Sequence, residues 1–191
     1  HRDGFGFVKP EVPLRGIEGD IFIPPENAQK AMHGDTVQVR VKRSGNRAEG
    51  DIVQILKHGT ETIVGEFIVR KRGFFVKPHD QRFRDWIEIP SGFEFPKHPL
   101  NVDRVGVKTP EIKTPMDLDG QIVNVKILEY SEHGDNAIGQ VIEVLGHPDD
   151  FGIDVEITIR KHHLPDQFPE EVLEEARSFT EPSGDDLKGR E

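Results

Sequence analysis

Three phenylalanines near the start of the chain are spaced so that their rings can gather on one surface. Phe5 and Phe7 lie in segment 3–10, DGFGFVKP, and Phe22 lies in segment 20–24, DIFIP. Successive side chains of a strand point to opposite faces, so Phe5 and Phe7 share a face if segment 3–10 is extended. Exposed rings of this kind stack on unpaired nucleobases, which makes both segments candidates for contact with single-stranded nucleic acid.

The neighbours of these rings favour an outward orientation. Two isoleucines flank Phe22 and take the buried side of its strand, which leaves the ring on the opposite side. Gly6 leaves room for a planar base, and Lys9 and Arg2 are near enough in sequence to contact phosphates. The alternative is that the three phenylalanines are ordinary core residues.

A second copy of the pattern has lost part of this aromatic surface. Aligning segment 8–10 with segment 76–78 keeps one of the three rings, as Phe75. Gly73 and Glu88 stand where the other two rings would be, and a carboxylate does not offer a stacking surface. Base contact is therefore less favoured in the second copy than contact with the nucleic-acid backbone.

Two other aromatic residues of the second copy, Phe74 and Trp86, are expected to point away from this surface. The candidate contacts with nucleic acid in the second copy are Phe75, Lys77, Arg70 and Arg72.

Four sequence blocks occur twice, in the same order, and define an internal repeat. Two of the blocks have been compared above, 7–10 with 75–78 and 21–24 with 87–90. In the third, segments 34–41 and 120–127 share a glycine followed by alternating apolar residues. Segments 48–56 and 137–145 match in their alanine, glycine and apolar positions. Alternation of this kind is typical of half-buried strands, so the chain holds two copies of one β module.

Each copy contains about five short strands when complete, separated by turn residues, which favours a small antiparallel barrel of the OB class. The fold is therefore expected to be mainly β, with two consecutive OB-type, cold-shock-like barrels. The first domain covers residues 1–57 and begins without a first strand. The second covers residues 58–147 and carries a proline-rich insertion, a loop or small ribbon, at about 91–118.

The last part of the chain, residues 148–191, is expected to be an acidic linker. Apolar residues alternate over 153–159 and predict one more strand, whereas the spacing of apolar residues over 169–179 predicts an amphipathic helix. One strand and one helix do not form a core by themselves. We therefore expect this linker to pack on a part of the protein outside this sequence.

Composition limits the possible classes of protein. The formal net charge is −10, but residues 148–191 hold 13 acidic and 5 basic residues, so the remainder is nearly neutral. A nucleic-acid partner is therefore compatible with the two β modules. There is no cysteine, no apolar run long enough to span a membrane and no signal peptide, which favours a protein of the cytoplasm. We expect it to be a monomer.

No constellation of a catalytic or metal site is recognisable. The nine histidines lack paired ligand spacing except for the adjacent His162 and His163, and the carboxylate groups fall on a turn, a helix face and a polar tail. There is no phosphate loop, nucleophile elbow or zinc protease motif. We expect no catalytic residue, no metal ligand and no cofactor within this sequence.

The order of these motifs resembles the front part of the ribonuclease R-type members of the bacterial ribonuclease II family. The resemblance rests on GFGFV at 4–8, DIFIP at 20–24 and GQVIEVLG at 139–146, and it continues through segments 157–165 and 168–172. It covers nearly the whole chain.

This resemblance implies a parent enzyme, a processive 3′-to-5′ exoribonuclease that hydrolyses RNA with magnesium held by an aspartate cluster. That cluster belongs to a catalytic domain expected to follow Glu191. The resemblance further implies that Phe5, Phe7, Phe22 and Lys9 gather single-stranded RNA for that domain. The alternatives are a docking scaffold for other protein parts and a stand-alone cold-shock RNA chaperone.

Overall fold

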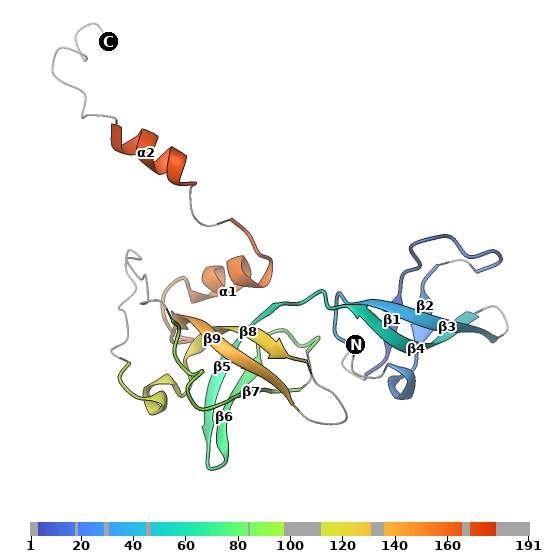
Figure 1. Cartoon of the computed structure of the whole chain (residues 1–191), viewed down its shortest axis with the longest axis horizontal. Helices are drawn as coiled ribbons and strands as arrows, with labels where there is room; N and C mark the ends of the chain where they lie inside the picture. The colour runs from blue at the N-terminus through green and yellow to red at the C-terminus, as the bar shows by residue number, and fades with distance from the viewer. Residues whose placement is uncertain are drawn as a thin grey trace, which may run out of the picture.

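The chain forms two β units and two helices in the computed structural model, which describes residues 4–17, 19–28, 31–44, 47–83, 85–97, 112–130, 136–165 and 169–178. Figure 1 shows the two units side by side along the long axis of the molecule. The strands of the first unit are β1 (Gly6–Val8), β2 (Ile21–Ile23), β3 (Thr36–Ser44) and β4 (Arg47–Lys57). The strands of the second are β5 (Thr62–Arg70), β6 (Gly73–Pro78), β7 (Ile87–Ile89), β8 (Ile122–Glu129) and β9 (Ala137–Gly146).

The two units share one topology, which confirms the mainly β fold of OB type. The second unit is a closed barrel with strand order β5-β6-β7-β9-β8, and the first is a sheet with order β1-β2-β4-β3. The first order is the second without the counterpart of β5. Pairing within each unit is antiparallel except for β2 with β4 and β7 with β9, which are parallel in both copies. Among the described residues, the first unit thus stays open between β1 and β3. The missing first strand and the domain limits remain predictions.

The size of the core in each unit depends on whether its sheet closes into a barrel. In the barrel, eleven residues form one fully buried cluster, with Phe67 and Val76 completely covered. In the open sheet the described cluster has three buried members, Ile21, Ile23 and Ile52. Residues such as Val8 on β1 and Val37 on β3 are only partly covered there, because no strand in the described part of the chain closes the gap between these two edges.

Equivalent glycines allow the strands to approach each other in both units. A Cβ added to Gly50 would lie 2.9 Å from the Ile21 side chain, and one added to Gly139 would lie 2.8 Å from the corresponding Ile87. Real Cβ contacts are not this short, so any side chain at these positions would displace its packed neighbours. The internal repeat is therefore present in packing as well as in sequence.

The strand expected over 153–159 is wrong, because this segment forms helix α1 (Ile153–Lys161). Residues i and i+4 share a helical face, and Ile153 and Ile157 are the buried pair, whereas Val155 is 56% exposed. The two isoleucines cover Val64 and Leu145 on the outside of the barrel. Acidic residues in the first turn and basic residues in the last turn match the helix dipole, a signal that the β-branched alternation hid.

Helix α1 is fixed to the barrel by an ion pair as well as by apolar packing. Arg160 reaches Glu143 on β9 through two bonds, Nε to Oε2 at 2.7 Å and Nη2 to Oε1 at 2.8 Å. Bidentate geometry of this kind orients both side chains. The end of α1 is consequently held in a defined place beside β5 and β9.

The second expected helix is confirmed as α2 (Glu170–Ser178), and Figure 1 shows it projecting away from the barrel. Its Val172 is 43% exposed. No helix in the described part of the chain is long and apolar enough to cross a membrane.

The expected insertion at 91–118 lies in part outside the described residues, including the candidate ribbon. Its two described ends pack on the barrel. The carbonyl oxygen of Phe93 accepts a hydrogen bond from the Val141 amide at 2.9 Å. At the other end, the 3₁₀ helix Pro115–Leu118 places Leu118 in the barrel core with no exposed surface.

The connection between the units, residues 58–61, is bound to both. The Asp35 carboxylate of the first unit accepts a hydrogen bond from the Gly59 amide at 3.0 Å and lies 3.2 Å from Nδ1 of His58. The Thr60 hydroxyl donates to the His33 carbonyl at 3.0 Å. On the barrel side, Tyr130 donates its hydroxyl to the Thr60 carbonyl and stacks its ring on His58.

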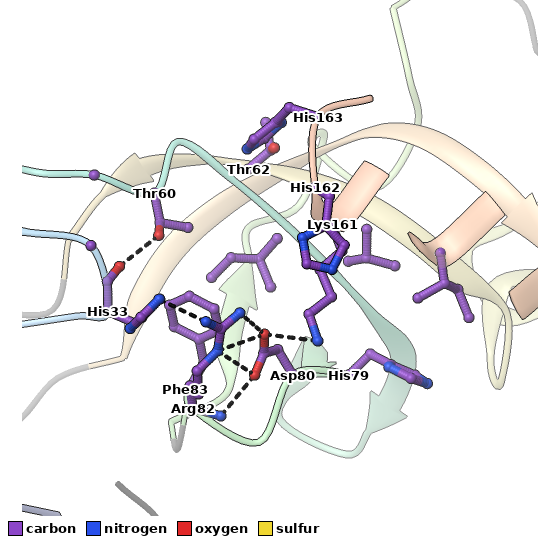
Figure 2. Close-up of a pocket in the computed structure, with 15 residues that line it drawn as sticks. His33, Thr60, Thr62, His79, Asp80, Arg82, Phe83, Lys161, His162 and His163 are labelled. Atoms are coloured by element: carbon purple, nitrogen blue, oxygen red, sulfur yellow. Dashed lines mark hydrogen bonds and ion pairs between the residues drawn. The ribbon is translucent and has the colours of Figure 1, made fainter. Parts of the chain in front are cut away.

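A charged cluster also connects the two β units, and Figure 2 shows it. Asp80, between β6 and β7, is 9% exposed and accepts bonds from Nε and Nη2 of Arg82. Nζ of Lys161, at the end of α1, lies 3.1 Å from the same carboxylate. Nη1 of Arg82 also lies 2.6 Å from Nε2 of His33, so the cluster links the first unit, the barrel and α1.

The cluster perturbs the ionisation of its members. Hydrogen bonds from Arg82, with a further one from Lys161, hold the pKa of Asp80 well below its usual range, although burial acts in the opposite direction. The pKa of His33 is lowered, first by burial and then by the positive charge of Arg82. His33 therefore faces Arg82 as a neutral ring that accepts the hydrogen bond.

The close approach of strands at the two glycines can be tested by adding one methyl group. We expect Gly50→Ala and Gly139→Ala each to lower the free energy of unfolding by about 1 to 3 kcal/mol, because the new Cβ displaces packed side chains. Urea unfolding followed by circular dichroism measures this. Gly6→Ala is the control, since its Cβ would meet no atom within 4 Å. If all three variants unfold like the wild type, the described packing is wrong.

The Asp80 cluster predicts a pH-dependent contribution to stability. Because the folded-state pKa of Asp80 is depressed, its stabilisation is present above the unfolded-state pKa, which is about 4, and is lost as the pH falls toward the folded value. We expect Asp80→Asn to cost roughly 2 kcal/mol at pH 7, and the difference from wild type to shrink below pH 4. The control Asp149→Asn changes a carboxylate that is 92% exposed. A difference that stays constant from pH 7 to pH 3 contradicts this assignment.

Candidate nucleic-acid interface

The structure brings Phe5, Phe7 and Phe22 together on the outer face of the first sheet. Phe7 pairs with Phe22 across β1 and β2. The ring centroids are 5.8 Å apart for Phe5 and Phe7, 5.7 Å for Phe5 and Phe22, and 5.8 Å for Phe7 and Phe22. We call these three residues the aromatic triad. Its rings meet edge to face or tilted, which leaves ring surface toward solvent, and Phe7 is 63% exposed.

Burial of alternate residues on β2 is the reason for this arrangement. Ile21 and Ile23 are 3% and 1% exposed, so Phe22 between them must face outward. The same alternation corrects the expectation for Gly6. This glycine pairs with Ile23, so its open side faces the core and not the triad. Room for a base above the triad comes from the exposure of Phe7 instead.

Charged residues surround the triad on the same face. Lys9 follows Phe7 at strand spacing and is exposed, whereas Arg2 lies outside the described residues. Phe22 aligns with Glu49 on β4, and Glu49 with Lys42 on β3. Nζ of Lys42 forms an ion pair with Asp51 at 2.7 Å, so this lysine is partly neutralised.

Arg40 is a further cation on this face and is not among the candidates named from the sequence. It pairs with Asp51 in the ladder and is exposed. The alternation of Val37, Val39 and Val41 on β3 places Arg40 outward by the same rule that places Phe22. That signal was available in the sequence.

The equivalent face of the barrel carries a different set of residues. Phe75 pairs with Glu88 on β7 and with Ile68 on β5, which places it on the outer face as expected. Phe74 points the other way and stacks on Phe67 in the core, with centroids 5.8 Å apart.

The expectation that Trp86 points away is wrong. Its ring lies 6.2 Å from the Phe75 ring, and the guanidinium carbon of Arg70 lies 5.4 Å from its centroid. Trp86 is two positions before the outward Glu88, so strand alternation places both on one face. Arg70, Phe75 and Trp86 therefore form a second cluster, held by a cation–π contact.

Lys77 and Arg72 remain at the margins of this second cluster. Lys77 pairs with Glu66 in the ladder and is exposed, and Arg72 is exposed in the turn between β5 and β6. Glu66 and Glu88 place two carboxylates on this face, and Glu88 pairs directly with Phe75. The two copies thus share a fold but not a binding chemistry.

The described residues do not fit a magnesium site of the kind that the family resemblance implies for whole enzymes. No group of three or more histidine, aspartate or glutamate side chains among them comes together in a way that could hold a metal ion.

Comparisons with known proteins agree with this architecture. Residues 1–55 match the family model described as ribonuclease B OB domain, and residues 96–169 match the cold shock domain model. The chain is 34% identical over 190 residues to ribonuclease R of Acidithiobacillus ferrooxidans, covering 98% of the chain and 38% of that relative. It is 30% identical over 190 residues to ribonuclease R of Vibrio cholerae, covering 98% of the chain and 21% of that relative.

Solved structures show the same fold at low identity. Mycoplasma genitalium RNase R in complex with ribose methylated single-stranded RNA aligns with a TM-score of 0.64 at 16% identity, over 89% of this chain and 24% of that one. The yeast pseudonuclease Ssd1 aligns with a TM-score of 0.57 at 12% identity, over 84% of this chain and 23% of that one.

The chain spans well under half the length of these relatives. Within that span, the ribonuclease B OB domain model matches the first β unit. The cold shock domain model matches a later part of the chain that includes β8 and β9 of the second unit. The chain belongs to the ribonuclease R family, of which it carries the OB and cold-shock domain region.

Proposed function

We propose that this region binds single-stranded RNA on the aromatic triad and guides it to the catalytic domain of a ribonuclease R-like 3′-to-5′ exoribonuclease. The observation that carries the proposal is the triad itself, three rings within 6 Å of one another on a strand face beside Lys9. Stacking on such rings contributes about 1 to 3 kcal/mol per base and does not depend on base identity.

The surroundings of the triad support RNA as the ligand. Lys9 and Arg40 offer positive charge to a phosphate backbone on the same face. Ribonuclease R relatives match along nearly the whole chain, and one structural neighbour is described in complex with single-stranded RNA. Hydrolysis and its magnesium belong to the parent enzyme in this proposal, because the described residues here supply only binding.

The acidic residues on the same face limit the affinity. Glu49 and Asp51 lie beside the triad and reduce the net positive charge, although Lys42 compensates Asp51. Binding should therefore be weak, dependent on salt and tolerant of sequence. These properties suit an RNA strand that must move over the surface while it is degraded.

Removing two rings tests the proposal. We expect Phe7→Ala with Phe22→Ala to weaken binding of a fluorescent single-stranded oligoribonucleotide by at least about tenfold, because two stacking surfaces are lost. Fluorescence anisotropy at low salt measures this, and thermal unfolding checks that the sheet stays folded.

The matched control is Phe151→Ala, which removes a phenylalanine that is 92% exposed outside the triad. Equal affinity of the double variant and the wild type contradicts stacking on the triad. A wild type that binds no RNA favours the docking-scaffold alternative.

The barrel face should make a second, weaker contact with RNA through Trp86. Since this is the one tryptophan of the chain, its fluorescence reports on that face directly. We expect the oligoribonucleotide to quench this fluorescence, and Arg70→Gln to weaken the quenching by a few-fold, because the cation–π contact that orients the ring is lost. Lys97→Gln serves as the charge control. Unchanged tryptophan emission at an RNA concentration that saturates the anisotropy signal would show that the barrel face is not used.

A further inference from the structure

A cavity of about 360 Å³ lies where the two β units and α1 meet. Figure 2 shows its lining, with His33 from the first unit, Asp80 and Arg82 from the connection between β6 and β7, and Lys161 at the end of α1. The remaining polar lining residues are Thr60, Thr62, His79, His162 and His163. Three parts of the chain that are distant in sequence thus supply one polar cavity.

The charges of this lining are unbalanced. Asp80 is the one carboxylate among the lining residues, and it lies between the two permanent cations Arg82 and Lys161. One negative charge cannot neutralise two positive ones, so the cavity keeps an excess of positive charge. The imidazoles of His162 and His163 add hydrogen-bond donors at its rim.

The two cations are held in place and yet accessible. Asp80 has 10% of its side chain exposed, whereas the side chains of Arg82 and Lys161 are 45% and 32% exposed. Nε of Arg82 contacts both oxygens of Asp80, Nη2 contacts one of them, and Nη1 lies against Nε2 of His33. A guanidinium carries five N–H donors, so one hydrogen on each Nη atom is left for another acceptor. Donors with a fixed position and spare hydrogens lose little freedom when they bind an anion.

The cavity also adjoins the first unit. A neighbouring cavity of about 680 Å³ is lined mainly by core-side residues of that unit, such as Ile23 and Ile52, and its lining includes Phe5 and Phe7. It shares His33, Gly34, Arg82 and Phe83 with the junction cavity. The two cations therefore lie at the margin of the unit that carries the aromatic triad.

We propose that the junction cavity binds a phosphate group of an RNA backbone, with Arg82 and Lys161 as its charged ligands and His162 beside them. This inference rests on the proposed RNA-binding function and adds a phosphate site to it. Because the ligands come from the barrel and from α1, while His33 of the first unit orients Arg82, a bound phosphate connects all three parts. RNA binding would then stabilise the arrangement of the two β units.

The first experiment measures the salt dependence of oligoribonucleotide binding. Each phosphate contact with single-stranded nucleic acid contributes about 0.7 to the slope of log K against log salt. We expect Lys161→Gln to reduce the slope by about this amount and Lys161→Arg to retain it. Lys97→Gln, which changes an exposed lysine outside the cavity lining, should reduce it less. Equal slopes for Lys161→Gln and the wild type overturn the proposal.

The second experiment uses inorganic phosphate as the probe and the histidine ring signals in the NMR spectrum of the full chain as the readout. We expect phosphate to shift the signals of His162 and His33, and Lys161→Gln to remove these shifts. Sulfate in place of phosphate shows whether any tetrahedral anion suffices. The absence of phosphate-dependent shifts in the wild type, combined with an unchanged salt slope in Lys161→Gln, means that the cavity is only a structural junction.

The two experiments also separate this site from the proposed function. If phosphate shifts the histidine signals but the oligoribonucleotide does not bind, the cavity is an anion site and the RNA-backbone assignment is overturned. If the triad variant loses RNA binding while Lys161→Gln behaves like the wild type in both experiments, RNA binding on the triad is supported and the phosphate site in the junction cavity is overturned.

Discussion

The contact of Ile21 with Gly50 determines most of what the first unit can do. Gly50 lets β2 and β4 approach closely enough to bury Ile21 and Ile23 against the sheet. Once these two side chains are buried, strand alternation leaves Phe22 no place except the outer face, next to Phe7. The aromatic triad is therefore a consequence of core packing, and its rings need no further support to stay exposed.

The same packing operates in the barrel around Gly139 and Ile87, but the outer face has diverged. Where the first unit has Phe22, the barrel has Glu88, and its rings come from Phe75 and Trp86. A fold that is fixed from the inside leaves its outer positions free to change. One copy thus keeps a surface suited to stacking, while the other combines a cation–π cluster with acidic neighbours.

Much of the fold can be predicted from the sequence because the strands are short and strictly alternating. The internal repeat predicts the strand segments of both units and their OB-type fold, and comparing the copies predicts that the first lacks a counterpart of β5. The helix α1 could not be recognised in this way. Its β-branched residues alternate as in a strand. The helical form instead lets Ile153 and Ile157 cover Val64 and Leu145 of the barrel, a tertiary contact that the local pattern does not contain. The Asp80 cluster was also not predictable, because its members come from segments about 130 residues apart at most and meet only through the tertiary fold.

Photo-crosslinking would show directly whether RNA bases contact the outer face of β1 and β2. A single-stranded oligoribonucleotide with photoreactive bases would be irradiated on the intact chain, and the modified residues would be mapped by mass spectrometry. We expect the main crosslinks to fall on Phe5, Phe7 and Phe22, with a weaker site at Trp86. Crosslinks confined to other surfaces, with none on β1 or β2, would contradict this expectation.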